Sequence, residues 1–485
     1  MKRQKKLAIL TGALVVVCAA AWTAVGTEKH KEKIENSDEV ILEIPKDTVT
    51  SLAWEHDGKK LAFHKDENWI YDEDDAFPVS EKMINRLLEN FVEFGVSFKI
   101  EDAEDLSQYG LDDPECTIEL KTDDNTYDIS LGDFSAMDSE RYVSIGDGNV
   151  YLVKTDPMDE FNVELKDMIQ NDKIPSYKTA EKITFTGEDS YTVTRDEDDD
   201  TDTYRDDDIF FAERDGKKVP LDTGSVNGYL NRLSGVSMAE YVTYKATDEE
   251  IAKYGLDDPE VTIVVDGSAL AQNTDDDGSE KKDDEEKYED VSVKVCVSRS
   301  AEDKKKGAKK ADSNKDDSEK KDVPDAAYLR VDDSPILYKI SGDVYEELME
   351  YTYNDLRHKE VLTADLDDIV QIDISLEGNT YTIMSEKKVK DRVYKYEDEE
   401  ISSDKLVSAL KALKADEFTN EQPGDKEEIG LTLHLNRDGD PTVDVRLYRY
   451  DGSDCLAVVD GMPVSLVARS LVVDLVEAVH GIVLK

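Results

Sequence analysis

The spacing of the six histidines decides which metal chemistry the sequence can encode. They are His30, His56, His64, His358, His434 and His480. No pair forms the His-Glu-x-x-His or His-x-His pattern of zinc hydrolases. His56 and His64 lie on one expected hairpin and can share a face, but two histidines do not complete a metal site. The sequence therefore predicts no metal ligands and no cofactor.

Serine and cysteine patterns give no catalytic assignment either. There is no Gly-x-Ser-x-Gly elbow, no phosphate-binding loop and no Gly-x-Gly-x-x-Gly opening a helix. Ser402-x-x-Lys405 has the spacing found in penicillin-binding proteins but lacks the companion motifs, and Ser402 lies where a helix cap is expected. Cys116, Cys296 and Cys455 are too widely spaced for a disulfide framework or a zinc site. We expect a protein that is not an enzyme.

Paired aspartates occur in a heptapeptide that the chain contains twice. Tyr109–Glu115 recurs identically as Tyr254–Glu260. Two carboxylates side by side can bind a cation or perform acid–base chemistry. A turn explains the motif better, because Gly takes positive φ, Leu reaches the core, Pro fixes the next strand and Asp bonds backbone amides. The residues assigned to this structural motif are Tyr109, Gly110, Leu111, Asp112, Asp113, Pro114, Tyr254, Gly255, Leu256, Asp257, Asp258 and Pro259.

Each heptapeptide follows an amphipathic helix and precedes alternating strands, which indicates a repeated unit. The first helix is capped by Ser80, and its apolar stripe is Met83, Ile84, Leu87, Leu88 and Phe91. The stripe of the second is Val226, Tyr229, Leu230 and Leu233. Both units are expected to close with a strand and a helical stretch, at 158–168 in the first and 344–356 in the second.

A third, degenerate unit is expected at the end of the chain. Ser403 is positioned to cap a helix bearing Leu406, Val407, Leu410 and Leu413. Ile429-Gly430-Leu431 stands in the place of Tyr-Gly-Leu, without the Asp-Asp-Pro. Residues 465–479 form the expected closing helix.

The predicted class is α+β, with three tandem repeats of antiparallel sheet, each bearing one or two amphipathic helices, after an N-terminal transmembrane helix. The expected divisions are an anchor (1–27), a linker (28–45), repeat 1 (46–178), repeat 2 (179–357) and degenerate repeat 3 (358–485). Repeat 2 contains charged insertions near 273–289 and 301–325, whose composition predicts disorder.

Charge limits the partners of the chain. Its 114 acidic and 60 basic residues give a formal net charge of −54, which argues against binding nucleic acid. Residues 196–208 form a third acidic segment, expected to be a solvated loop. No segment has the glycine and glutamate spacing of a calcium-binding loop, so we expect only weak association with divalent cations.

The N-terminus predicts a membrane anchor. Four cations within the first six residues precede an uncharged stretch of 20 residues, 7–26, and acidic residues follow from Glu28. A helix of that length spans about 30 Å, the thickness of the hydrocarbon core. The charge asymmetry predicts a single-pass protein of the cell membrane, with a cytoplasmic N-terminus and an extracytoplasmic C-terminal ectodomain. The triplet Ala24-Val25-Gly26 also fits a cleaved signal peptide.

The duplicated motif resembles the bacterial family named domain of unknown function 4340. The resemblance also rests on Trp69 in the opening meander, on Leu87-Leu88 and on Leu131-Gly132-Asp133, and covers most of residues 46–357. It implies an extracytoplasmic, membrane-tethered protein of the kind associated with ABC exporters of the gliding-motility type, and it brings no catalytic residues.

These observations favour a non-catalytic binding or accessory protein that serves a membrane or envelope complex through a protein partner. The first alternative is an envelope hydrolase acting on peptidoglycan or polysaccharide through paired carboxylates. The second is an acidic surface protein that associates with cations.

Overall fold

The structure, a computed structural model, describes residues 34–197, 205, 207–214, 216–271, 287–305, 324–362, 364–388, 392–437, 439 and 441–484. The predicted anchor and most of the predicted insertions near 273–289 and 301–325 lie outside these residues. Within the described part of the chain, no helix has both the length and the apolar character needed to cross a membrane.

The three repeats are called units 1, 2 and 3 below. Unit 1 begins with a strand in a segment that sequence analysis assigns to a linker. Ile34–Leu42 forms β1, which pairs antiparallel with β5 (Phe94–Ile100) and belongs to the first sheet. The prediction of a linker over 28–45 is wrong for these residues, because their backbone groups complete a sheet edge. The other elements are η1 (Lys46–Thr48), β2 (Val49–His56), β3 (Lys59–Lys65), β4 (Trp69–Tyr71), α2 (Glu81–Glu89), η2 (Leu106–Tyr109), β6 (Cys116–Thr122), β7 (Thr126–Ser135), β8 (Glu140–Ser144), β9 (Val150–Val153), α3 (Met158–Phe161) and η3 (Leu165–Met168).

Unit 2 has the same succession of a meander, a helix, a turn and an antiparallel run. Its closing stretch consists of two short helices, as in unit 1. The elements are β10 (Tyr177–Gly187), β11 (Tyr191–Arg195), β12 (Phe210–Arg214), β13 (Lys217–Pro220), α4 (Thr223–Ser234), β14 (Tyr241–Thr243), α5 (Asp248–Lys253), β15 (Val261–Leu270), β16 (Tyr288–Ser298), β17 (Ala326–Val331), β18 (Leu337–Ser341), α7 (Gly342–Met349) and α8 (Tyr353–Leu356).

Unit 3 departs from two predictions. Ile429, Gly430 and Leu431 lie inside β24 (Glu427–Leu435), so no counterpart of the Tyr-Gly-Leu turn stands there. Ser465 lies in β27 (Met462–Ala468), and the closing helix α10 begins only at Arg469 and runs to Val483. The remaining elements are β19 (Ile369–Leu376), β20 (Asn379–Lys387), β21 (Arg392–Tyr396), β22 (Glu399–Ile401), α9 (Asp404–Ala412), β23 (Glu417–Phe418), β25 (Thr442–Arg449) and β26 (Asp454–Val459).

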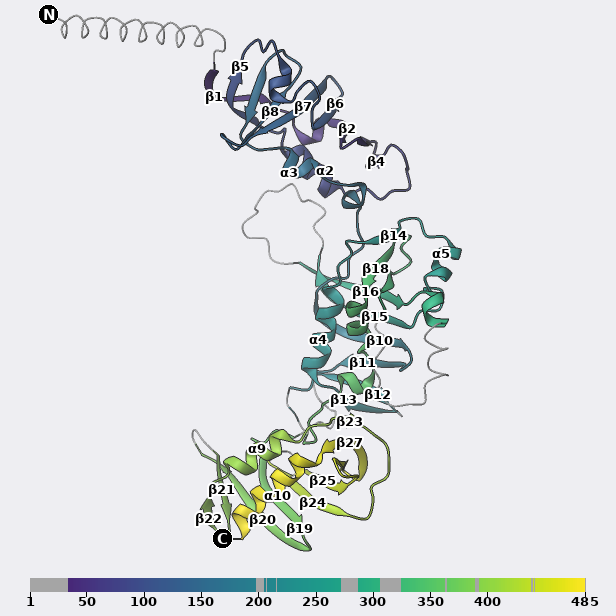
Figure 1. Cartoon of the computed structure of the whole chain (residues 1–485). Coiled ribbons are helices and arrows are strands. Elements are labelled where there is room, and N and C mark those ends of the chain that lie inside the picture. The colour runs from purple at the N-terminus through teal and green to yellow at the C-terminus, as the bar shows by residue number, and fades with distance from the viewer. Residues whose placement is uncertain are drawn as a thin grey trace, which may run out of the picture.

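The strand order shows that units 2 and 3 are copies of one fold and that unit 1 is a variant of it, with one strand fewer in its opening meander and the extra edge strand β1 beside β5. Each sheet has nine strands, and the units follow one another from the top of Figure 1 to the bottom. The orders are β4-β3-β2-β6-β7-β8-β9-β5-β1, β13-β12-β11-β10-β15-β16-β17-β18-β14 and β22-β21-β20-β19-β24-β25-β26-β27-β23. The prediction of an α+β protein with three repeated antiparallel sheets is confirmed. The predicted transmembrane helix lies outside the described residues.

Strand register places equivalent residues in the three cores. In each sheet one buried apolar residue of the central strand pairs with buried apolar residues on both neighbours. These rows are Phe63, Leu52 and Leu120 in unit 1, Val193, Ile183 and Val265 in unit 2, and Ile383, Ile372 and Leu433 in unit 3. Alternation along a strand puts every second side chain on the same face, so one face of each sheet packs under its helices.

The amphipathic helices cover those apolar faces as predicted. Ser80 caps α2 by accepting from the amide of Met83 at 3.4 Å, and Asp222 caps α4 by accepting from the amide of Ser225 at 2.6 Å. Ser403 precedes α9 but makes no side-chain capping bond, so its predicted role as a hydrogen-bonding cap is wrong. In unit 3, α9 and α10 lie side by side over the sheet (Figure 1).

Candidate functional site

The two Tyr-Gly-Leu turns occupy equivalent places in units 1 and 2. Gly110 and Gly255 have φ of +67° and +74°, which explains why glycine is required at both. Tyr109 packs on Tyr142 of β8 with ring centroids 5.0 Å apart, and Tyr254 packs on Tyr328 of the equivalent strand β17 at 4.4 Å. The leucines that follow, Leu111 and Leu256, are buried.

The aspartates of the heptapeptides are exposed in both units. Asp112, Asp113, Asp257 and Asp258 face outward, and the prolines after them are half-buried. Among the described residues, none of these aspartates belongs to a group that could hold a metal ion. The two turns lie in different units, so the structure does not bring their carboxylates together into one site.

The glutamate after each proline has a structural partner that sequence analysis did not predict. Glu115 accepts from Arg141 of β8 at 2.7 Å. Glu260 accepts from the guanidinium and the backbone amide of Arg299, at 2.6 Å and 2.8 Å. The two arginines come from different positions in the repeat, so the same glutamate anchors the turn by different routes.

A second glycine explains part of the wider motif. A Cβ on Gly132 would lie 2.1 Å from the carbonyl oxygen of Tyr109. Gly132 therefore allows the strand β7 to pass directly under the turn. Contact between the Leu131-Gly132-Asp133 strand and the Tyr-Gly-Leu turn ties together two segments that the sequence shows separately.

The other residues singled out for chemistry do not form a site. His56 is paired across the hairpin with Lys59, and His64 with Ser51, so the histidines lie at opposite ends and on opposite faces. The prediction that they share a face is wrong. Each has its own partner: the ring of His56 contacts the carbonyl of Glu115 at 2.9 Å, and that of His64 contacts Asp72 at 2.7 Å. Ser402 and Lys405 are both exposed.

A cluster that sequence analysis missed lies where unit 2 meets unit 3. His358 follows α8, and its side chain is 5% exposed. Its Nε2 lies 2.7 Å from a carboxylate oxygen of Asp208, whose side chain is 3% exposed. Its Nδ1 lies 3.4 Å from Oδ2 of Asp222 and makes no hydrogen bond. One ligand atom each from Asp222, His358 and Glu360 lies within 4.8 Å of the others.

The burial of Asp208 corrects the prediction of a solvated acidic loop over 196–208. Residues 198–204 and 206 lie outside the described part, but Asp208 points into the protein and pairs with His358. The acidic composition of the segment does not reveal that Asp208 is buried. Composition cannot tell which aspartate of an acidic run pairs with a buried side chain. The only local signal was His358 two residues before Glu360.

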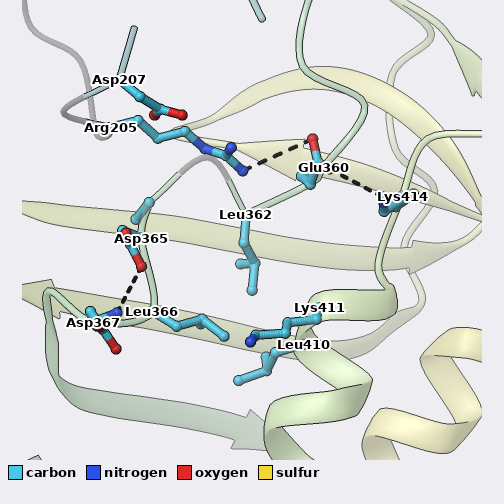
Figure 2. Close-up of a pocket in the computed structure, with 11 residues that line it drawn as sticks. Arg205, Asp207, Glu360, Leu362, Asp365, Leu366, Asp367, Leu410, Lys411 and Lys414 are labelled. Carbon is cyan, nitrogen blue, oxygen red and sulfur yellow. Dashed lines mark hydrogen bonds and ion pairs between the residues drawn. The ribbon is translucent and has the colours of Figure 1, made fainter. Parts of the chain in front are cut away.

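A pocket of about 750 Å³ adjoins this cluster (Figure 2). Glu360 lies between two cations, 3.2 Å from Nζ of Lys414 and 3.9 Å from the guanidinium of Arg205. Figure 2 shows three leucine side chains gathered on the other side of the pocket. The lining residues are Arg205, Asp207, Glu360, Leu362, Ala364, Asp365, Leu366, Asp367, Leu410, Lys411 and Lys414.

The charged groups of the junction perturb one another. Burial raises the pKa of Glu360, but hydrogen bonds from its own backbone amide and from Lys414, with the charge of Arg205, outweigh burial and hold that pKa below its usual range. Burial lowers the pKa of Arg357, whose guanidinium lies between the rings of Tyr353 at 5.0 Å and Phe418 of β23 at 4.4 Å. Arg357 therefore joins unit 2 to unit 3 through aromatic contacts.

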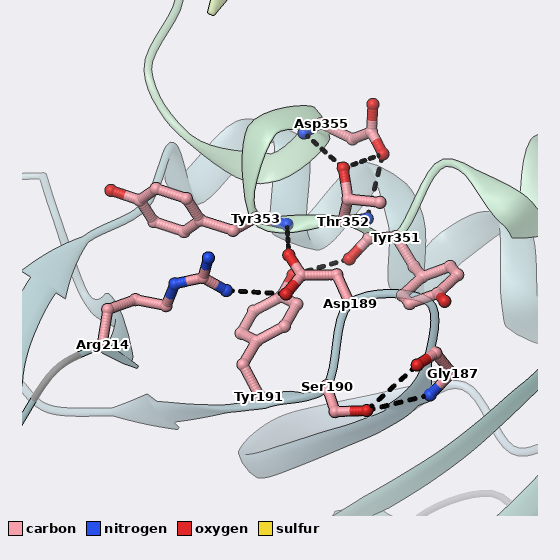
Figure 3. Close-up of polar contacts among 9 residues, drawn as sticks. All are labelled: Gly187, Asp189, Ser190, Tyr191, Arg214, Tyr351, Thr352, Tyr353 and Asp355. Carbon is pink, nitrogen blue, oxygen red and sulfur yellow. Dashed lines mark hydrogen bonds and ion pairs between the residues drawn. The ribbon is translucent and has the colours of Figure 1, made fainter. Parts of the chain in front are cut away.

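A polar network positions the segment that leads to His358 (Figure 3). Asp189, in the turn after β10, accepts from Arg214 at 2.7 Å and from the amide of Tyr353 at 2.9 Å. The hydroxyl of Tyr191 donates to the carbonyl of Tyr351 at 2.6 Å. These bonds fix α8 on the β10–β11 hairpin, and His358 follows α8 by two residues.

Comparison with known proteins gives one match. Residues 69–259 match the model of a protein family described as "Domain of unknown function (DUF4340)". The matched segment runs from the start of β4 to the proline of the second heptapeptide. No curated protein and no solved structure matches the chain.

Proposed function

The chain belongs, through its residues 69–259, to the DUF4340 family, and from this premise we propose that it is a non-catalytic, membrane-anchored binding protein. Its ectodomain lies outside the cytoplasm and serves as an auxiliary component of an ABC-type export complex or another envelope complex. The sequence support for the location is the uncharged stretch 7–26 behind four N-terminal cations.

The observation that carries this proposal is the threefold repetition of one sheet. Three nine-stranded sheets follow one another along the chain, with the same strand order in units 2 and 3 and a variant of it in unit 1. Repeated units stacked in a row provide an extended surface, which is how tandem arrays bind large partners. An array that starts at a membrane anchor holds this surface close to the proteins of that membrane.

The short edge strands favour the junction pocket as the contact surface. Five of the six edge strands in the described sheets, β4, β13, β14, β22 and β23, have two to four residues. Short edges protect a sheet from pairing with another chain, so they offer little backbone for an added partner strand. The pocket between units 2 and 3 instead combines leucines with charges of both signs. This lining suits a polypeptide segment with apolar and charged side chains.

Co-purification tests the proposal. The full chain, solubilised from its native membrane in mild detergent, is expected to bring down a membrane protein, with the permease of an ABC-type exporter as the specific expectation. Lys411→Glu changes an exposed pocket residue on α9 and is expected to reduce the recovered partner at least tenfold. Lys82→Glu, an exposed lysine on the equivalent helix α2, is the matched control and is expected to retain it.

Two results would contradict this function. The accessory role fails if no membrane protein co-purifies with the full chain. The assignment of the pocket fails if Lys82→Glu and Lys411→Glu lose the partner equally. Clearing of peptidoglycan or polysaccharide zymograms by the purified full chain would favour the hydrolase alternative.

A further inference from the structure

We propose that Asp222, His358 and Glu360 bind a divalent transition-metal cation of the zinc class at the junction of units 2 and 3. One ligand atom of each residue lies within 4.8 Å of the other two. A cation at their centre would be reached by all three with small side-chain movements. The inference is independent of the proposed partner, because it concerns the purified chain and the metal alone.

The unpartnered Nδ1 of His358 points to a metal-ligand role for this side chain. A side chain that is 95% buried should have its polar atoms bonded, but Nδ1 has no hydrogen-bond partner. When Nε2–H donates to Asp208, Nδ1 carries a lone pair, and it faces Oδ2 of Asp222 at 3.4 Å. Two acceptors in this position require a proton or a metal cation between them.

Asp208 provides the second shell that metal-binding histidines use. A carboxylate on the far nitrogen fixes the tautomer, orients the ring and makes the other nitrogen a better ligand. The side chain of Asp208 is 3% exposed and lies 2.7 Å from Nε2. The buried carboxylate of Asp208 would therefore orient a metal ligand as well as accept the hydrogen bond of His358.

The two carboxylates are held in place by the backbone. Asp222 uses Oδ1 to cap α4, at 2.6 Å from the amide of Ser225, and its own amide donates to Leu356 at 3.0 Å. Its Oδ2 remains directed at His358. Glu360 is fixed by a β-bridge to Lys414, whose side chain is 57% exposed, so that its ammonium can turn to solvent when a cation binds.

The ligand set selects the class of metal. Calcium and magnesium sites are built from oxygen alone, whereas imidazole nitrogen with carboxylates suits zinc and its neighbours. Three protein ligands leave one position of a tetrahedral ion open. Because Asp222 belongs to unit 2 and Glu360 to the segment that starts unit 3, the bound ion would join the two units.

Calorimetric titration of the purified full chain with Zn²⁺ tests this site. We expect one ion per chain, retained at physiological salt. Glu360→Gln and Asp222→Asn each remove a ligand, and Asn still caps a helix; each is expected to weaken the affinity at least tenfold. Asp208→Asn is expected to weaken it tenfold to a hundredfold, as for other second-shell changes.

His434→Gln is the matched control, because His434 also pairs with an aspartate, Asp373, at 2.8 Å but lies outside the cluster. This variant is expected to bind Zn²⁺ as the unmodified chain does. Circular dichroism checks the folding of every variant, and a tetrahedral Co²⁺ absorption band that is lost in Glu360→Gln gives a second readout. Weak, salt-sensitive heats that Glu360→Gln leaves unchanged would overturn the site and reduce the binding to counterion association.

Discussion

Phe77 and Tyr244 pack edge to face across the junction of units 1 and 2, whereas His358 and Asp208 meet as a polar pair across the junction of units 2 and 3. The aromatic rings lie 5.0 Å apart and belong to a hydrophobic cluster that runs through both units. Unit 3 has a hydrophobic cluster of its own. Units 1 and 2 therefore share one hydrophobic core across the first junction, whereas the second junction joins two units that have separate cores.

The two junctions differ in their capacity to bind a further partner. The apolar junction is stabilised by the removal of its side chains from water. A polar junction contains charged side chains, and these can exchange their present partners for a metal ion or for side chains of a bound protein. This contrast supports the proposal that binding takes place at the second junction.

Phe77→Ala should give the largest effect, because it opens the shared core. Phe77 is 3% exposed, and large-to-small core changes of this kind cost about 3–5 kcal/mol. Denaturant unfolding followed by the fluorescence of Trp54 and Trp69 measures the free energy of unfolding of unit 1. Phe134→Ala, at a residue 47% exposed, is the control and should cost less than about 0.5 kcal/mol. Equal costs would mean that the first junction is not a core.

Asp208→Ala should have an intermediate effect, confined to the second junction. It removes the partner of the buried His358, and the loss of such a bond costs about 2 kcal/mol. In the metal-free protein, hydrogen exchange in residues 353–362 should speed up roughly thirtyfold if that free energy governs local opening. Asp72→Ala, which removes the exposed partner of His64, should leave exchange in 353–362 unchanged. Unaltered exchange in Asp208→Ala would show that the polar pair does not hold the junction.

The stabilisation that Asp74 gives to the first junction should be lost at acid pH. Hydrogen bonds from Lys245 and Tyr244 lower the pKa of Asp74 from 3.8 to about 2. A lowered folded-state pKa stabilises the protein above the unfolded value and loses that stabilisation as pH falls toward the folded value. The melting temperature of Asp74→Asn should thus lie below that of the unmodified chain at pH 6, and the gap should close between pH 3.8 and about 2. A gap that is constant with pH would refute this role of Asp74.

Lys414→Met should give the smallest effect. The ion pair with Glu360 is half-exposed, at 57% and 30% for the two side chains, so its loss should cost less than about 1 kcal/mol. Thermal unfolding in low salt and in 1 M NaCl should show a small difference that disappears at high salt, where the screening length is about 3 Å. Lys405→Met, at an exposed lysine on the preceding helix α9, provides the comparison. A large cost that salt does not reduce would mean that the second junction is more buried than its geometry implies.

Local patterns were enough to predict the α+β class, the repetition and the main helices. The stripe Val226, Tyr229, Leu230 and Leu233 is buried as a set, because helical periodicity acts within a few residues. The prediction of a turn at Gly430 is wrong because a glycine between two apolar residues is compatible with both a turn and a strand. Only the pairing with Ser375 and Arg446 places it in β24.

The candidate site was beyond such patterns, since it is assembled from distant parts of the chain. Asp208 and Asp222 flank a hairpin of unit 2, while His358 and Glu360 stand more than 130 residues later. Asp208 closes an acidic run whose composition suggested solvent exposure. Burial of one carboxylate depends on the packing of α8, which Asp189 and Tyr191 hold from another hairpin.

Photo-crosslinking in intact membranes tests whether the chain binds a membrane protein at the junction of units 2 and 3, as we propose. A benzophenone amino acid is placed at Lys411 in the pocket and, as control, at Lys82 on the equivalent helix of unit 1. We expect an ultraviolet-dependent adduct with one integral membrane protein from position 411 and none from position 82. No adduct from position 411, or the same adducts from both positions, would contradict it.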